Sequence, residues 1–441
     1  MALVMHVAPG EVEGRGHAPD PDPAWARTAA VVWPSVDEPG RTAARPAARR
    51  RRGDVPRERY RLVRFEGRVR FAVDAGLGRR ARRAVLRYGN DLRAPSRRWA
   101  RRLVGSWFLL GAGDRVGDLV AVPGDDDALG LRTAAAAALG CDEGTVHLSF
   151  AVIDREGSAR PTVLVSDGRG RPRLFLKVGA GAARLAALER EHDATDVAAA
   201  RSHREDVGIL VPRPVLLHRA GQGGALGLTP LPDDVTPVDA EDPTPTWRVL
   251  DRLVAAGPTS APRLEDSPWL RRLLADARGL RDGRGPLGVP VGPVVAHLGR
   301  RAVEMAAEYH RHHGDAFLLH GLRHGDWSPW NLGWTGTGAQ RRLVAWDWEF
   351  GEAEAPVALD RHNWQFARAT SVDRVAAGPA ARALLERSTT DGPAALGTSP
   401  LTARLFLLDM AVRRALLAAA GERRAVEAAS ALLDVLAADV V

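Results

Sequence analysis

The chain has 441 residues and a formal net charge of +8, a length that allows two or three domains with sizeable cores. Its single cysteine, Cys141, excludes an internal disulfide and a zinc site built from several cysteines. We find no leader-like apolar segment near the N-terminus and no run long enough to cross a bilayer, so we expect a cytoplasmic chain with no membrane partner.

The positive charge is concentrated in one region. Residues 41–104 contain 22 arginines and five acidic residues, which by itself would suit a polyanion-binding surface. No nucleic-acid-binding motif accompanies these arginines. The chain is rich in Ala, Arg, Gly and Pro, a composition that GC-rich coding would produce. We therefore interpret the block as an arginine-biased surface and do not expect a nucleic-acid partner.

The first third of the chain predicts a tail followed by a small module. Residues 1–55 show no apolar periodicity and end in a basic run, which predicts a disordered basic tail. The segment 59–74, RYRLVRFEGRVRFAVD, alternates apolar and charged residues around a Glu-Gly turn and predicts a β-hairpin. The segment 96–110 has helical spacing. We expect residues 56–138 to form an accessory α/β module of unknown role.

The next region predicts a small antiparallel lobe over residues 139–235. Strand-like runs cover 145–154, 161–167 and 173–178, and a helix-forming run covers 182–202. Two further strands are predicted over 211–219 and 224–232.

From residue 236 to 441 the pattern becomes mostly helical, so the expected fold class is α+β. One helix is expected behind Pro293, with Val294, Leu298, Met305 and Tyr309 on its apolar stripe. A later helix has Ser399 as its N-cap, Pro400 at its first position and Gly421 as its stop.

Two short stretches carry candidate chemistry. The first, HGDWSPWN at 324–331, places Asp326 and Asn331 in a loop interrupted by Pro329. The second, VAWDWEF at 344–350, delivers Asp347 at the end of an apolar strand. Two carboxylates and an amide oxygen are ligands that suit Mg²⁺ bound together with phosphate oxygens. A carboxylate that is not a ligand can accept a proton from an attacking hydroxyl.

Together these stretches resemble the motifs of the aminoglycoside phosphotransferase and choline kinase superfamily, and the resemblance covers about residues 145–370. It implies a protein-kinase-like fold with a small β lobe and a larger helical lobe. It also implies an ATP- and Mg²⁺-dependent enzyme that phosphorylates a hydroxyl of a small molecule. By the same resemblance Asp326 is the catalytic base, Asn331 and Asp347 bind the metal, and His324 is structural. Asp360 matches an aspartate found at a helix start in such enzymes.

The resemblance also gives a role to Lys177, the one lysine among 62 lysines and arginines. In the family a lysine on the third strand contacts the nucleotide phosphates and pairs with a glutamate on the following helix. Lysine presents a compact charge, whereas the planar fork of arginine is longer. Glu191 is the expected partner, with Glu189 as the alternative.

The nucleotide site is completed by less specific segments. Ser158, in the turn after the first strand of the lobe, is expected near the phosphates. The hinge at 226–232, which includes Thr229 and Leu231, is expected to offer backbone groups to the adenine. The role of Glu349 stays open between the site and a local salt bridge.

Two alternative functions are compatible with the same residues. One is a catalytically silent, nucleotide-binding interaction module on the same fold. The other is a metal-dependent phosphoesterase that uses the carboxylates and histidines.

Overall fold

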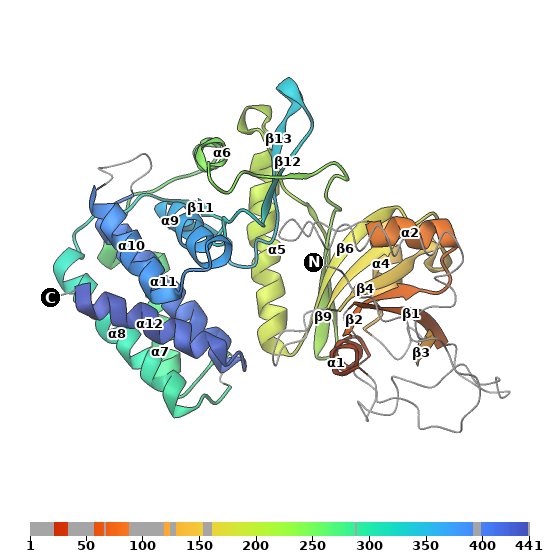
Figure 1. Ribbon diagram of the computed structural model, residues 1–441, viewed down its shortest axis with the longest axis horizontal. Helices are drawn as coiled ribbons and strands as arrows, with labels where there is room; N and C mark the ends of the chain where they lie inside the picture. The colour runs from red at the N-terminus through yellow and green to blue at the C-terminus, as the bar shows by residue number, and fades with distance from the viewer. Residues whose placement is uncertain are drawn as a thin grey trace, which may run out of the picture. The chain divides into compact units, whose positions relative to one another are not determined.

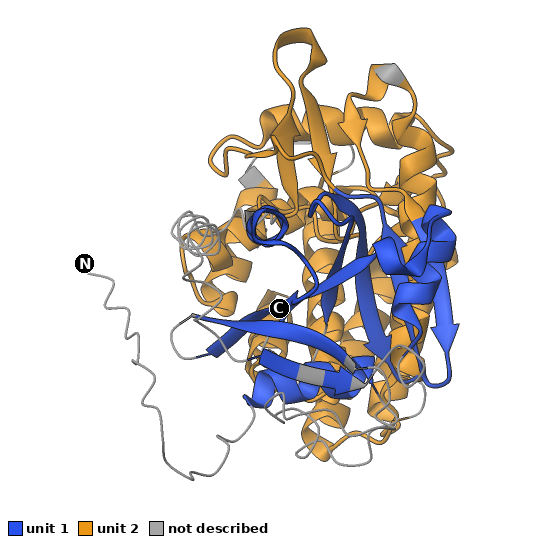
Figure 2. Cartoon of the chain, turned by 90° about the vertical axis from the view of Figure 1, so that its right-hand side faces the viewer, with its two compact units in different colours: residues 1–154, 159–181, 215–230 blue, residues 155–158, 182–214, 231–441 orange. Residues whose placement is uncertain are grey.

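A computed structural model of the chain describes residues 22–33, 57–65, 68–87, 119–123, 129–152, 161–286, 289–390 and 398–439. Within these residues, antiparallel strands and helices form the α+β fold expected from the sequence (Figure 1). The chain divides into two compact units (Figure 2). Unit 1 comprises residues 1–154, 159–181 and 215–230, and unit 2 comprises residues 155–158, 182–214 and 231–441.

Unit 1 is built on one eight-stranded sheet with the order β3-β1-β2-β4-β5-β6-β9-β8. Its strands are β1 (Arg57–Phe65), β2 (Arg68–Asp74), β3 (Leu119–Pro123), β4 (His147–Ala151), β5 (Thr162–Ser166), β6 (Pro172–Ala180), β8 (Pro214–Ala220) and β9 (Gly223–Leu228). The hairpin and the five strands predicted for the small lobe are therefore confirmed. Each neighbouring pair described by its register is antiparallel.

Alternation along the strands supplies a core on each face of this sheet. On β6, Leu174, Leu176 and Val178 are buried in the cluster that also includes residues of α1 (Pro23–Val32) and α4 (Leu131–Leu139). Phe175 points the other way, toward the smaller cluster formed with α2 (Arg79–Arg87). Successive side chains of a strand face opposite sides, so Lys177 shares the face of Phe175.

Two boundaries differ from the expected ones. The segment 56–138 does not form a sheet of its own among the described residues, because β1, β2 and β3 extend the same sheet as β4 to β6. The expected tail contains helix α1, whose first turn is capped by Asp22 through hydrogen bonds from the N–H groups of Ala24 and Trp25. Trp25 is fully buried against aromatic residues of the sheet core. The expected helix at 96–110, and the rest of the expected tail, lie outside the described residues.

Unit 2 is largely helical. Its helices are α5 (Ala182–Ser202), α6 (Thr244–Ala255), α7 (Pro268–Arg281), α8 (Pro293–His313), α9 (Ala358–Ala367), α10 (Ala377–Thr390), α11 (Pro400–Ala419) and α12 (Arg424–Asp439). Helices α7 to α12 share one apolar core. In the described part of the chain, no helix is both long and apolar enough to span a membrane.

The cap of α11 is as predicted from the sequence, but the apolar stripe predicted for α8 contains one wrong residue. Ser399 accepts a hydrogen bond from the N–H of Thr402 and forms a capping box, as its position before Pro400 predicts. On α8, Leu298 and Tyr309 are buried as expected, but Val294 is 58% exposed. Val295 is buried in its place, because the inward stripe of this helix runs through 295, 298, 302, 306 and 309.

Two small sheets in unit 2 position the candidate site. One has the order β10-β12-β13-β7, and the other pairs β11 with β14. Their strands are β7 (Ile209–Leu210), β10 (Thr236–Pro237), β11 (His320–Arg323), β12 (Leu332–Thr335), β13 (Arg342–Ala345) and β14 (Glu352–Pro356). The loop 324–331 connects β11 to β12, so each sheet anchors one end of it.

Candidate functional site

Strand pairing brings Asn331 close to Asp347. Leu332 on β12 lies opposite Ala345 on β13, and the carbonyl of Asn331 accepts a hydrogen bond of 3.1 Å from the N–H of Trp346. Asp347 follows directly with φ of 67°, in the left-handed region that non-glycine residues adopt at a cost. The register thus places one amide and one carboxylate at the same end of the hairpin.

The Asp326 carboxylate is held by two asparagine side chains. Asn331 Nδ2 donates to Asp326 Oδ2 at 2.8 Å, and Asn363 Nδ2 donates to Asp326 Oδ1 at 3.2 Å. Burial, followed by the negative charge of Asp347, raises the pKa of Asp326 to about 6, although the two amide hydrogen bonds act in the lowering direction. The charge of Glu349 adds a smaller raising effect. Asp326 is thus hydrogen-bonded by two amides and is influenced by the charges of two further carboxylates.

His324 has a structural place in this loop, and its hydrogen bonds define one tautomer. Its ring nitrogen Nδ1 accepts a hydrogen bond of 3.2 Å from the N–H of Asp326, so Nδ1 carries no proton. Nε2 lies 3.0 Å from the carbonyl oxygen of Trp346 and must therefore donate to it. The buried ring thus ties the Asp326 backbone to the segment just before Asp347.

Helix α9 supports the same loop from its first turn. Asp360 is fully buried, and its two oxygens accept hydrogen bonds from the N–H groups of His324 at 2.7 Å and Gly325 at 2.8 Å. This confirms the helix start expected around Asp360. The Asp360 carboxylate therefore fixes the loop through its backbone, and no loop side chain is needed for these two hydrogen bonds.

A buried ionic cluster on α11 completes the support. Arg413 donates to the carbonyl oxygen of Gly325 at 2.8 Å and pairs with Asp409 at 3.0 Å. Asp409 also accepts from Arg323, the fully buried residue at the end of β11, at 2.7 Å. Burial acts to raise the pKa of Asp409, but the two arginines outweigh it and lower that pKa. Helix α9 thus holds the N–H groups of His324 and Gly325, and helix α11 holds the carbonyl oxygen of Gly325.

Asn331 and Asp347 form a donor set that fits a magnesium ion. The amide nitrogen of Asn331 is engaged with Asp326, which leaves the amide oxygen as the metal-binding end. Mg²⁺ takes one or two protein carboxylates and fills its other positions with water and phosphate oxygens. Among the described residues, no group of three or more His, Cys, Asp and Glu side chains has the arrangement of a metal site.

The residues predicted for nucleotide binding lie in both units. Lys177 is on β6 in unit 1, in register with Thr162 and Leu226, and Thr229 follows β9. Glu191, on α5 in unit 2, is 2% exposed, and Leu231 is also in unit 2. Ser158 lies outside the described residues. The pairing of Lys177 with Glu191 therefore stays a prediction.

Sequence reasoning missed Asn363 and Arg413. Both contact the loop from helices that begin more than 25 residues after it, so no motif around Asp326 includes them. A compositional signal was present for Asn363, since the chain has only three asparagines, Asn90, Asn331 and Asn363. For Arg413, one arginine among many, the sequence offered no comparable signal.

No family model and no curated protein sequence matches the chain. The chain aligns with solved structures of small-molecule kinases. A microcompartment-associated aminopropanol kinase is 16% identical, with 69% of this chain and 96% of that chain covered and a TM-score of 0.37. The ethanolamine kinase of Plasmodium vivax is 10% identical, with 68% and 84% covered and a TM-score of 0.37.

An aminoglycoside phosphotransferase from Alicyclobacillus acidocaldarius is 16% identical, with 65% of this chain and 92% of that chain covered and a TM-score of 0.29. All three TM-scores are below 0.5. A functional assignment therefore rests on the side chains of the site.

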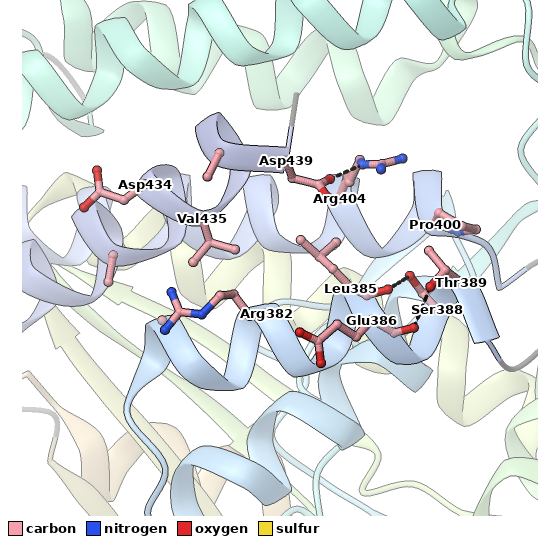
Figure 3. Close-up of a pocket in the computed structure, with 13 residues that line it drawn as sticks. Arg382, Leu385, Glu386, Ser388, Thr389, Pro400, Arg404, Asp434, Val435 and Asp439 are labelled. Carbon is pink, nitrogen blue, oxygen red and sulfur yellow. Dashed lines mark hydrogen bonds and ion pairs between the residues drawn. The ribbon is translucent and has the colours of Figure 1, made fainter. Parts of the chain in front are cut away.

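A separate surface cavity of about 530 Å³ lies among helices α10, α11 and α12 (Figure 3). Its lining mixes apolar residues such as Leu385 and Val435 with charged ones, and the Arg404 guanidinium is paired with Asp439. None of the candidate site residues lines it. We assign it no part in the chemistry of the loop.

Proposed function

We propose that the chain is an ATP- and Mg²⁺-dependent phosphotransferase of the aminoglycoside phosphotransferase and choline kinase type. It transfers the γ-phosphoryl group to a hydroxyl of a small molecule. The observation that carries the proposal is the Asp326 carboxylate, held by Asn331 at 2.8 Å and influenced by the charge of Asp347. A base and two metal-binding oxygens within one loop and hairpin are the parts that phosphoryl transfer requires.

Asp326 is assigned as the general base. As the acceptor oxygen bonds to the γ-phosphorus, its O–H bond breaks, the proton passes to Asp326, and ADP leaves. A pKa of about 6 supports this role, because the carboxylate is mostly deprotonated at pH 7 yet more basic than an ordinary aspartate.

Asn331 and Asp347 are assigned as the metal ligands. A bound Mg²⁺ supplies neutralisation of the phosphate charge. The chain holds these ligands in place through the pairing of β12 with β13 and through the Asn331–Asp326 contact. Since Asp347 and Asp326 repel each other, a cation beside Asp347 also favours the charged form of Asp326.

The nucleotide contacts are proposed from the sequence. Lys177 would contact the phosphates and pair with Glu191, the more buried of the two candidate glutamates. Ser158 would lie near the phosphates, and Thr229 and Leu231 would flank the adenine. For Lys177 the support is its place on the third strand of the predicted lobe, on the face opposite the larger core.

The test is an acceptor panel. The protein is incubated with Mg²⁺ and ATP labelled in the γ-phosphate, and each reaction contains one aminoglycoside, amino alcohol or sugar. We expect label to appear in one acceptor class and turnover to fall at least about 100-fold in Asp326→Asn, the scale for loss of a general base. Nucleotide affinity should be nearly unchanged in that variant.

Other results would redirect the assignment. Nucleotide binding without transfer to any acceptor would favour the silent-module alternative. Metal-dependent hydrolysis of a simple phosphate ester without ATP would favour the phosphoesterase. Full turnover in Asp326→Asn would remove Asp326 from the mechanism.

A further inference from the structure

We propose that Asn363 is a positioning residue which, together with Asn331, fixes the rotation of the Asp326 carboxylate. The inference rests on the proposed function, in which that carboxylate accepts a proton. Both oxygens of the Asp326 carboxylate accept a hydrogen bond from an asparagine. Oδ2 accepts from Asn331 at 2.8 Å, and Oδ1 accepts from Asn363 at 3.2 Å.

Two contacts on two different oxygens define the plane of the carboxylate. The terminal torsion of an aspartate is otherwise broad, with no steep staggered minima. With Asn331 alone, the carboxylate could turn about its last bond while keeping one hydrogen bond. The Asn363 contact removes that freedom and sets which lone pair faces an incoming hydroxyl.

Asn363 is itself rigidly placed. It is 2% exposed on α9, three residues after Asp360, which holds the backbone of His324 and Gly325. Its amide nitrogen has two hydrogens and two acceptors, Asp326 Oδ1 and the carbonyl oxygen of Trp327, both at 3.2 Å. One side chain therefore ties the carboxylate to the backbone of the next residue.

The chemistry of an amide suits this position. A neutral amide donates hydrogen bonds without cancelling the negative charge that makes Asp326 a base, as an arginine would. An aspartate there would bring a like charge against Asp326. Only three asparagines occur in 441 residues, and two of them hold the same carboxylate. We take this concentration as independent support.

Asn363 can be tested more cleanly than Asn331, because Asn331 is also a proposed metal ligand. Asn363→Ala removes the donor, and Asn363→Asp keeps the shape but replaces the NH₂ group by an oxygen. We expect kcat to fall about 10- to 100-fold in Asn363→Ala, the scale of a misplaced reacting group. KM for MgATP should stay within about threefold. Asn363→Asp should be impaired at least as strongly.

His362→Gln is the matched control. His362 is the neighbouring buried residue of α9, but its ring contacts Thr402 on α11, at 3.0 Å. We expect its kcat to stay within about threefold of wild type. An unchanged kcat in Asn363→Ala would overturn the proposal. So would equal losses in Asn363→Ala and His362→Gln, because that result would indicate a general effect of helix packing.

A second measurement needs no activity. Protein labelled with ¹⁵N only in asparagine gives three side-chain NH₂ signal pairs, which single substitutions assign. We expect Asp326→Ala to shift both the Asn331 pair and the Asn363 pair. An unmoved Asn363 pair would overturn the proposal. If the wild-type protein phosphorylates no acceptor, the proposed function fails, and this measurement alone decides whether Asn363 holds Asp326.

Discussion

Asp326 is subject to effects that favour opposite protonation states. Burial and the charge of Asp347 raise its pKa, while the amides of Asn363 and Asn331 lower it. At the resulting pKa of about 6, the carboxyl group of Asp326 is ionised in most molecules at pH 7. The amides also orient the carboxylate, so each contact influences both its basicity and its direction.

At the residue scale, the metal assignment predicts a loss of Mg²⁺ dependence in Asp347→Ala. The metal would lose its proposed carboxylate ligand, and nucleotide affinity should no longer increase with Mg²⁺. Calorimetric titrations of ATP with and without Mg²⁺ measure this difference. Glu354→Ala, an exposed carboxylate on β14, is the control. If the Mg²⁺ titrations of wild type and Asp347→Ala superimpose, Asp347 is not a ligand.

The lone lysine gives a second residue-scale prediction. If Lys177 contacts phosphates in a narrow slot, Lys177→Arg should lower kcat/KM for ATP although the charge is retained. Its apo melting temperature should hardly change. Arg173→Lys makes the reverse exchange at an exposed position of the same strand, and should change the free energy of unfolding by less than about 0.5 kcal/mol. Wild-type ATP kinetics in Lys177→Arg would assign the lysine to an ordinary surface position.

At the scale of elements, local patterns were sufficient wherever a few neighbouring residues determine the structure. The strands β4 to β6, the cap of α11 and the hairpin that carries Asn331 and Asp347 all follow from such patterns. Helix α1 was missed because its alanine-rich sequence lies within a Pro-rich stretch. The support from α9 and α11 depends on tertiary packing across 37 and 88 residues, which a single sequence does not encode locally.

The contacts that Arg413 on α11 makes with Gly325 and Asp409 predict a loss of both stability and activity in Arg413→Met. The substitution removes the donor to Gly325 and one of the two arginines that neutralise the buried Asp409. Breaking a buried ion pair costs about 3–5 kcal/mol when the partner is left alone. Because Arg323 remains beside Asp409, we expect Arg413→Met to lower the free energy of unfolding by a smaller amount, about 2–3 kcal/mol.

Thermal unfolding and turnover of Arg413→Met measure the two losses. The control is Arg301→Met, which breaks the Arg301–Asp434 pair at 2.7 Å, whose aspartate side chain is 63% exposed. That pair should contribute less than about 1 kcal/mol. Equal destabilisation by the two substitutions would mean that the α11 cluster adds nothing beyond a surface ion pair.

At the scale of the whole molecule, the two units place the proposed functions on different parts of the chain. The proposed base and metal ligands, and the supports from α9 and α11, all belong to unit 2, whereas Lys177 belongs to unit 1. The β1–β3 extension adds strands and an aromatic core to unit 1. A destabilising change in the support of the loop should therefore be detected first in the unfolding of unit 2.

The stability of unit 2 should depend on pH through His362. Burial lowers the pKa of His362 to about 4, whereas an unfolded histidine titrates near 6.5. Between these values the unfolded chain binds a proton that the folded chain does not, so stability falls as the pH falls from about 6.5 toward 4. At pH 4.5 this effect lowers the free energy of unfolding by about 2–3 kcal/mol relative to pH 7.

His362→Gln tests this dependence through the slope of stability with pH. The substitution changes packing and the contact with Thr402, but those effects are nearly independent of pH. We expect the variant to lose less stability than wild type between pH 7 and 4.5, measured by thermal unfolding at each pH in the presence of EDTA. His320, whose pKa is also lowered by burial, leaves a residual slope in the same direction. Parallel pH curves for the two proteins would show that His362 is not the buried neutral histidine that the fold requires.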